Sequence, residues 1–199
     1  TLIGYNAGTA INSADANGSV AVGHQAGLAH TSGQMCVYLG HQAGLENAIG
    51  DSNVAIGYNA MFGTLASNQN DNNIAIGSEN PDGTLAAMGG QWAGSASLNN
   101  VAIGTGSMAG VMNASSNNIA IGTQALAALT TGDNNVVIGY QAGDVMTTNI
   151  GNVAIGLQAL SAATNDENYN VAIGYGCMGT VNATAADKNV AIGNGALLG

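Results

Sequence analysis

The sequence is poor in charge, and above all in positive charge. Its 199 residues include a single cationic side chain, Lys188, against eleven Asp and Glu, so the formal net charge is −10. Charged residues make up 6% of the chain, whereas an average soluble domain has roughly 25%. A protein without cationic side chains cannot replace the counterions around phosphates, which argues against nucleic-acid partners and against attachment to an anionic membrane surface.

Proline, aromatic residues, cysteine and long apolar runs are also scarce. One Pro and 4% aromatic residues leave Ala, Val, Ile, Leu and Met to build a core. No apolar run approaches the ~20 residues of a membrane-spanning helix, so we expect no membrane insertion. The two cysteines, Cys36 and Cys177, are far apart and lack the spacing of metal ligands. We therefore expect no cofactor, and we favour two buried free thiols over a disulfide.

The sequence does contain an internal repeat. A four-residue motif, most often VAIG or IAIG, recurs from one end to the other, and its closing glycine marks each copy. The sequence numbers of successive marker glycines differ by 19, 17, 17, 20, 27, 18, 17, 17, 18 and 19. Nine of these ten intervals fall between 17 and 20, which predicts one structural coil per repeat and a single repeat array over 1–199. The marker glycines are Gly4, Gly23, Gly40, Gly57, Gly77, Gly104, Gly122, Gly139, Gly156, Gly174 and Gly193.

Each position of the repeat has a structural interpretation. The first and third motif residues, such as Val54 and Ile56, are β-branched and alternate with Ala55, which predicts a short strand with both on one face. The marker glycine suits a tight corner. A small residue, usually Ala, stands three positions after the glycine, and we expect it in a second, buried strand. An Asn precedes eight of ten complete motifs and predicts a ladder of stacked amides. These residues are Asn53, Asn73, Asn100, Asn118, Asn135, Asn152, Asn170 and Asn189.

A coil of this length cannot bury its own apolar face, so it needs neighbours above and below. We predict an all-β fold, a parallel β-solenoid or β-roll of about eleven coils of 17–20 residues. Such a rod has open sheet edges at its ends, which an isolated domain has to cap. Neither end of the sequence shows a cap, and we expect the chain to be a segment of a longer fibre.

The repeat units carry a resemblance to two families. Units such as NNVVIGYQAG (134–143), GNVAIGLQAL (151–160) and NNIAIGTQAL (117–126) resemble the xNxAIGYQAL repeats of phage and phage-like tail fibres, which often end in an endosialidase-type chaperone domain. The serial VAIG units are also similar to the head repeat of bacterial trimeric autotransporter adhesins. That adhesin repeat is usually shorter than the repeat of this chain, so the intervals favour the fibre comparison. Both resemblances imply a homotrimer.

The resemblance to tail fibres implies a structural role: a trimeric shaft on the surface of a virion, outside the cell, that can attach to a host-surface glycan. The alternative is the head of a bacterial surface adhesin. An ice-binding solenoid is less expected, because no regular column of Thr is present. An acyltransferase-type left-handed β-helix would need three apolar hexapeptide positions per coil, and only one strong motif and a weaker second one occur.

A row of rings is the first candidate for recognition. The position after the marker glycine holds Tyr or His in six of eleven copies: Tyr5, His24, His41, Tyr58, Tyr140 and Tyr175. Amphipathic rings along a rod can stack on sugars and bond their hydroxyls. The alternative, which we favour, is that they cover sheet edges or meet a neighbouring subunit.

The 27-residue interval supplies the second candidate, an inserted loop at 78–100. It contains the chain's single Pro, Pro81, and its single Trp, Trp92. Loops that project from a rigid scaffold commonly carry binding function. Equally, Trp92 can pack back onto the rod as a plug.

We expect no enzymatic activity. His24 and His41 share a column, but no carboxylate or thiolate is paired with them, so a solvent-facing column is favoured over a metal site. Four aspartates share the third position before the motif, where turn chemistry is favoured over a Ca²⁺ ladder. They are Asp51, Asp71, Asp133 and Asp187. The acidic residues are dispersed in loops rather than paired, as glycoside hydrolysis would require.

Overall fold

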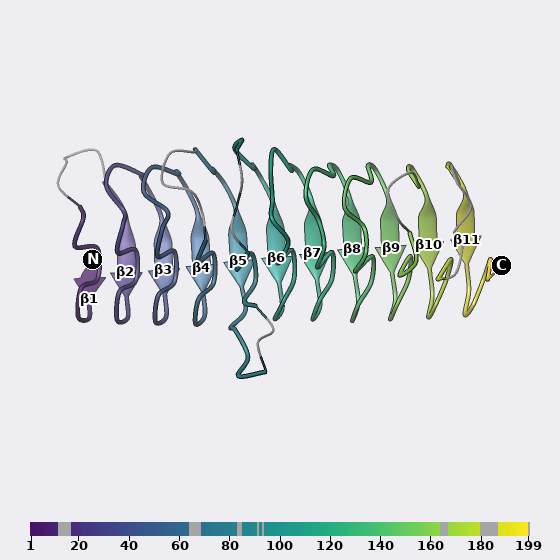
Figure 1. The fold of residues 1–199 in the computed structure, drawn as a ribbon, viewed down its shortest axis with the longest axis horizontal. Helices are drawn as coiled ribbons and strands as arrows, with labels where there is room; N and C mark the ends of the chain where they lie inside the picture. The colour runs from purple at the N-terminus through teal and green to yellow at the C-terminus, as the bar shows by residue number, and fades with distance from the viewer. Residues whose placement is uncertain are drawn as a thin grey trace.

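Eleven short strands lie side by side in chain order and point in the same direction (Figure 1). The computed structural model describes residues 1–11, 17–63, 69–82, 85–90, 92, 94–163, 167–179 and 187–198, and the strands are those found in this part of the chain. They are β1 (Leu2–Ile3), β2 (Val20–Val22), β3 (Val37–Leu39), β4 (Val54–Ile56), β5 (Ile74–Ile76), β6 (Val101–Ile103), β7 (Ile119–Ile121), β8 (Val136–Ile138), β9 (Val153–Ile155), β10 (Val171–Ile173) and β11 (Val190–Ile192). None of the described residues is helical, so none of them belongs to a helix that could span a membrane.

Neighbouring strands pair in parallel and in register. Val136 pairs with Val153 and Ile138 with Ile155, so equivalent residues of successive repeats stand in columns. This confirms the predicted parallel β-solenoid, with one strand per repeat. Eleven strands enclose only ten strand-to-strand intervals, and the number of complete turns is therefore slightly lower than the eleven coils expected.

The middle residue of each strand points into the solenoid, and the two flanking residues point outward. Ala55, Ala102 and Ala154 are fully buried, while the Val and Ile on either side are partly or largely exposed. Among the described residues the core consists mainly of Ala, Met and Leu, with one Val and no Ile. The expectation that Val and Ile build the core is therefore wrong. The interior of so small a coil has room for Ala but not for a β-branched side chain at most strand positions.

The small residue after the marker glycine is buried as predicted, but it lies in a turn and not in a second strand. In the seventh coil Ala125 is fully buried between Gln124 and Leu126, whose φ angles are +59° and +51°. Two left-handed residues around one Ala turn the chain sharply, which no strand allows. The Leu126 amide donates to the Ala142 carbonyl at 3.1 Å, so these turns also bond from coil to coil.

The marker glycines stack so closely that no other residue fits. Gly139 has a φ of +142°, and a Cβ added there would lie 2.3 Å from the carbonyl oxygen of Gly156. Both the backbone angle and the close approach require Gly. Together they explain why the motif ends in Gly in every copy.

The predicted asparagine ladder is present in the interior. The side-chain oxygen of Asn135 accepts the backbone amide of Asn152 at 2.9 Å, and its Nδ2 donates to the Asn149 carbonyl at 2.8 Å. The same oxygen-to-amide bond joins each neighbouring pair from Asn53 to Asn189. The ladder supplies partners to backbone groups that the three-residue strands leave unpaired.

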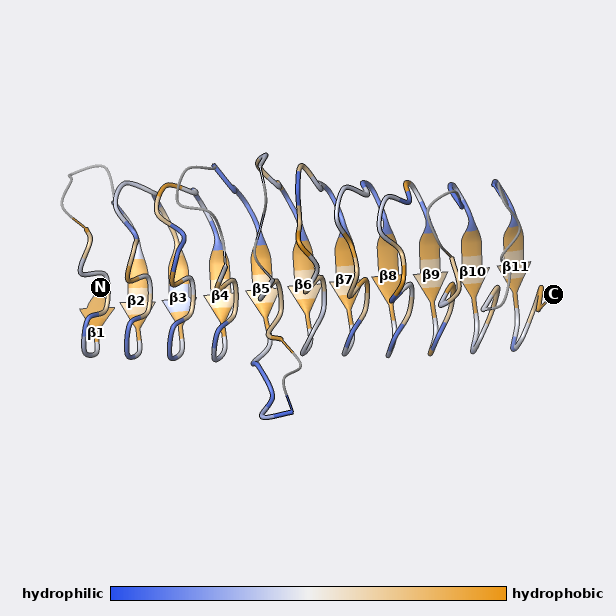
Figure 2. Ribbon diagram, in the orientation of Figure 1, coloured by the Kyte–Doolittle hydropathy of each residue, from blue (hydrophilic) through white to orange (hydrophobic). Residues whose placement is uncertain are grey.

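The inserted segment leaves the rod at the corner after β5 and returns to the repeat at Ala87. Figure 1 shows it projecting below β5, and Figure 2 shows the tip of this projection as hydrophilic. Ala87 takes the small-residue position of its coil, because its carbonyl accepts from Met61 at 3.1 Å. Asn80, which breaks that column in the sequence, belongs to the excursion. Of the predicted loop at 78–100, residues 83, 84, 91 and 93 lie outside the described residues.

Candidate interaction surfaces

The outer face of the sheet is an apolar band that runs along the rod. Both outward positions of every strand from β2 to β11 hold Val, Ile or Leu. Figure 2 shows these strands as a hydrophobic stripe. Leu39 is 46% exposed and Ile119 36%, and at the end of the sheet Ile192 reaches 67%. Soluble monomers rarely expose a continuous apolar patch of this extent, so the outer sheet face is a candidate interface.

The row of rings forms a stack over its first four members. The Tyr5 and His24 centroids are 5.4 Å apart, and those of His24 and His41 are 4.8 Å apart with an interplanar angle of 8°. Tyr58 continues the stack from His41 at 5.2 Å with a tilt of 56°. The rings thus cover one another's faces, which a sugar would need for stacking. This arrangement leaves little open ring face for a sugar in this part of the row.

Tyr140 and Tyr175 stand apart from the stack. They are 49% and 57% exposed, and Leu157 occupies the position between them in the column. No described aromatic ring stacks on either of them. The ring faces that remain open to a ligand are therefore in the C-terminal half of the row.

A ladder of glutamines lies beside the row of rings, at the second position after the marker glycine. Gln42 Nε2 donates to Gln25 Oε1 at 2.8 Å, and Gln141 Nε2 donates to Gln124 Oε1 at 2.9 Å. All four residues are left-handed, with φ between +51° and +59°. This ladder was not predicted, although Gln or Asn recurs in the same column of the sequence.

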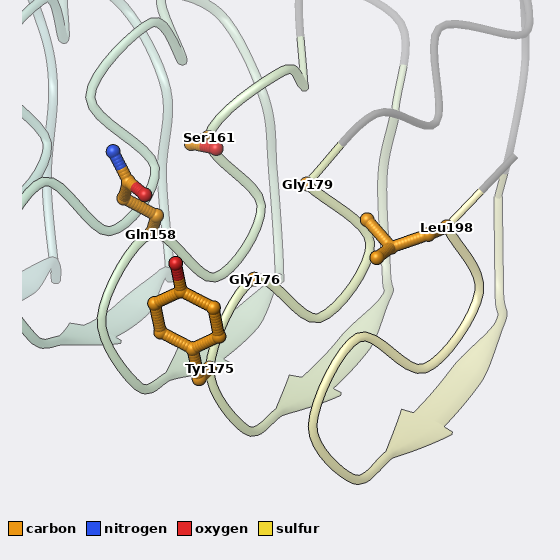
Figure 3. Close-up of a pocket in the computed structure, with 6 residues that line it drawn as sticks. All are labelled: Gln158, Ser161, Tyr175, Gly176, Gly179 and Leu198. Atoms are coloured by element: carbon orange, nitrogen blue, oxygen red, sulfur yellow. The ribbon is translucent and has the colours of Figure 1, made fainter.

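A pocket of about 210 Å³ opens where this corner reaches the last coils (Figure 3). In Figure 3 the Tyr175 hydroxyl points toward Gln158, and Leu198 lies on the far side. The lining residues are Gln158, Ser161, Tyr175, Gly176, Gly179 and Leu198. Of the ring residues predicted as ligand contacts, Tyr175 is thus the one that borders this pocket.

Trp92 is a core residue. It is 1% exposed, and its backbone amide donates to the Gly63 carbonyl at 2.9 Å. Of the two alternatives for Trp92, packing back onto the rod is therefore the one observed, and the side chain is not available to a surface ligand. The indole nitrogen has no hydrogen-bond partner among the described residues.

The predicted aspartate column serves the backbone. Asp71 Oδ1 accepts the Asp51 amide at 2.8 Å, and Asp133 Oδ1 accepts the Ser116 amide at 2.6 Å. Asp51 and Asp187 accept from the preceding coil in the same way. All four aspartates thus satisfy backbone amides, as favoured from the sequence, but they do so across coils and not within a local turn. The described residues contain no group of three or more His, Cys, Asp and Glu placed to hold a metal ion.

A buried polar cluster in the second and third coils was not foreseen. His30 is 1% exposed, with Nε2 at 3.1 Å from Ser19 Oγ and Nδ1 at 3.3 Å from the Tyr38 hydroxyl. Asn47 Nδ2 donates to the same hydroxyl at 3.0 Å. Burial lowers the pKa of His30 below its ordinary value. The cluster has no opening to solvent and carries a structural role. Cys36 beside it is a buried free thiol, as is Cys177, which agrees with the expectation from the sequence.

Comparison with known proteins adds no evidence on function, which therefore comes from the surfaces described above. No protein-family model, curated protein or solved structure matches this chain.

Proposed function

We propose that this chain is the shaft of a homotrimeric attachment fibre on a phage or virus-like particle. Its biochemical role is structural: it sets the length and stiffness of a rod and presents weak binding sites in three equivalent copies. Linked copies raise the overall affinity for a surface without stronger single contacts. A host-surface glycan is the attachment ligand that we propose, and we propose no catalytic activity.

The observation that carries this proposal is the outer sheet face. Its two columns of Val, Ile and Leu side chains run unbroken from β2 to β11, and nearly all of these side chains are at least partly exposed. Closed symmetry lets identical chains bury the same patch on one another. Three chains around an axis parallel to the rod would remove the band from water and leave the corner rows outside.

Two further features support an extracellular fibre. Side-chain and backbone ladders tie every coil to the next, which makes the rod resistant to local opening. A single Lys in the chain gives trypsin-like proteases almost no cleavage site. A bacterial adhesin head would share these properties, but the repeat interval favours the fibre.

The test is the mass of the chain in solution, measured by light scattering during size-exclusion chromatography. We expect the wild type to show about three times the 19.5 kDa of one chain. Ile121→Glu places a charge on the outer sheet face and should reduce the mass to that of one chain. Thr123→Glu adds the same charge two residues away on an exposed corner, and it should leave the trimer intact.

Two outcomes would overturn the proposal. A wild-type chain that stays monomeric at tens of micromolar is not a trimeric shaft. An Ile121→Glu chain that keeps the trimeric mass shows that the outer sheet face is not the interface. Circular dichroism of each variant establishes that the solenoid remains folded.

A further inference from the structure

The pocket near the last coils exists because the glutamine ladder stops at Gln158. Gln158 Nε2 donates to Gln141 Oε1 at 3.3 Å, which continues the pattern of the coils before it. The next residue in the column is Gly176, whose φ of +56° matches the +55° of Gln158. A Cβ added at Gly176 would meet no atom within 4 Å. The hollow therefore occupies the place of one missing glutamine side chain.

The end of the ladder leaves an acceptor facing this hollow. In the earlier coils the Oε1 atoms of Gln25, Gln124 and Gln141 each accept from the glutamine carboxamide of the following coil. Gly176 has no carboxamide, and no described residue donates to Gln158 Oε1. A ligand hydroxyl in the pocket can supply the missing donor.

The other walls provide an apolar surface and a second polar group. Tyr175, which is 57% exposed, forms one wall of the pocket with its ring. The Leu198 side chain lies on the opposite side (Figure 3). The Ser161 hydroxyl also lines the pocket and can both donate and accept. An aromatic face together with a few fixed polar groups suits a small ring with apolar C–H faces and a rim of hydroxyls. At about 210 Å³ the pocket is smaller than a usual ligand site and takes about one such ring.

Charge narrows the class of ligand further. The single cation of the chain, Lys188, precedes β11, whereas the pocket lies at the corner that follows the strands. The net charge of −10 repels anions, and none of the described residues that line the pocket is a cation. Sialic acids, uronic acids and sulfated sugars are therefore disfavoured.

We propose that this pocket is a subsite for one uncharged pyranose ring, held by Gln158 Oε1, the Ser161 hydroxyl and the face of Tyr175. The inference rests on the attachment function proposed above and names its ligand class. A trimer would present three copies of this pocket.

The experiment is ligand-observed NMR on the full chain with the methyl glycosides of glucose, galactose, mannose and N-acetylglucosamine. The methyl glycoside of N-acetylneuraminic acid serves as the charged comparison. Millimolar dissociation constants are expected for a single subsite of this kind. Gly176→Gln refills the pocket with the side chain that the three preceding coils carry, so it should abolish binding while the solenoid stays folded. Its cost in stability should be no more than that of placing a residue other than glycine in the left-handed region.

Two tyrosine variants form the matched control. Tyr175→Ala removes the ring of the pocket and should weaken binding at least tenfold. Tyr140→Ala removes a ring of similar exposure in the same column, but beside the filled position of Gln141, and binding should be unchanged.

The outcomes separate this inference from the shaft proposal. A neutral glycoside that binds the wild type and not Gly176→Gln supports the subsite. Equal binding by both chains, no binding of any neutral glycoside, or a preference for the charged sugar overturns it. A trimer that binds no sugar would support the shaft proposal and overturn the subsite. A monomer whose sugar binding is lost in Gly176→Gln would support the subsite and overturn the trimeric shaft.

Discussion

The ring of Tyr38 occupies the space that a side chain at Gly44 would fill. A Cβ added at Gly44 would lie 2.3 Å from Tyr38 Cδ1, and one added at Gly27 would lie 2.6 Å from Cδ2. In several other coils the middle strand residue is Ala and the position of Gly44 holds Met or Leu, as at Ala55 and Met61. The larger residue at Tyr38 and the smaller residue at Gly44 therefore compensate for each other inside the solenoid.

This compensation predicts strong coupling between the two sites. Tyr38→Ala leaves a cavity and should lower the free energy of unfolding by about 3–5 kcal/mol. Gly44→Met should also destabilise, because its side chain collides with the ring. The double variant restores the pattern of the next coil. Its loss of unfolding free energy should be smaller than the sum of the two single losses by about 0.5–3 kcal/mol. Urea unfolding of the four chains measures the coupling, and strict additivity would contradict it.

The stacking of the marker glycines predicts that the cost of a Gly→Ala substitution depends on its position in the coil. Gly139→Ala brings a Cβ to 2.3 Å from the Gly156 oxygen and should destabilise by more than about 3 kcal/mol, because both backbones are fixed by ladders. Gly176→Ala is the control, since its Cβ meets no atom within 4 Å. It should cost about 1–2 kcal/mol for the left-handed backbone alone. Thermal unfolding followed by circular dichroism compares the two, and similar losses would refute the stacking argument.

The asparagine ladder predicts a large effect from a small deletion. Asn135→Ala leaves the Asn152 amide and the Asn149 carbonyl without partners in a fully buried site. We expect a loss of about 2–4 kcal/mol from these two groups. Asn194→Ala removes an exposed carboxamide from a corner and should change stability by less than about 0.5 kcal/mol. Chemical denaturation of both variants tests the contrast, which fails if the losses are equal.

His30 predicts a fall in stability on mild acidification. Its pKa is lowered by burial, so between that value and the ordinary 6.5 the unfolded chain binds more protons than the folded one. Stability contributed by neutral His30 is thus present above pH 6.5 and is lost as the pH falls below it. The facing groups are Ser19, Tyr38 and Asn47, and the charge of Asp51 acts in the opposite direction.

The control for this pH effect is His30→Asn, which installs the residue found at the same position of the next coil, Asn47. The free energy of unfolding is measured between about pH 7.5 and 5. It should fall more steeply for the wild type, by at most about 1.4 kcal/mol per pH unit for one proton. Parallel curves for the two chains would show that His30 is not responsible.

Several features of the candidate surfaces were beyond sequence reasoning for physical reasons. Trp92 could be assigned either to a projecting loop or to the core, because nothing in its neighbours says where the chain rejoins the repeat at Ala87. The stacking of His24 on His41 follows from their shared column, but whether the ring faces are open depends on side-chain rotation. The pocket beside Tyr175 depends on an absence at Gly176, which is visible only when neighbouring coils are placed on one another.

The sequence by itself determined the coil, its parallel register and the positions of its ladders. A strict interval between glycines with β-branched flanks permits stacking in one register only, and every copy repeats the same local conditions. The tertiary structure decided which side of the strand faces inward and that the second strand is a turn. Alternation shows that Val54 and Ile56 share a face, but only the width of the closed coil shows that Ala55, and not they, fits inside.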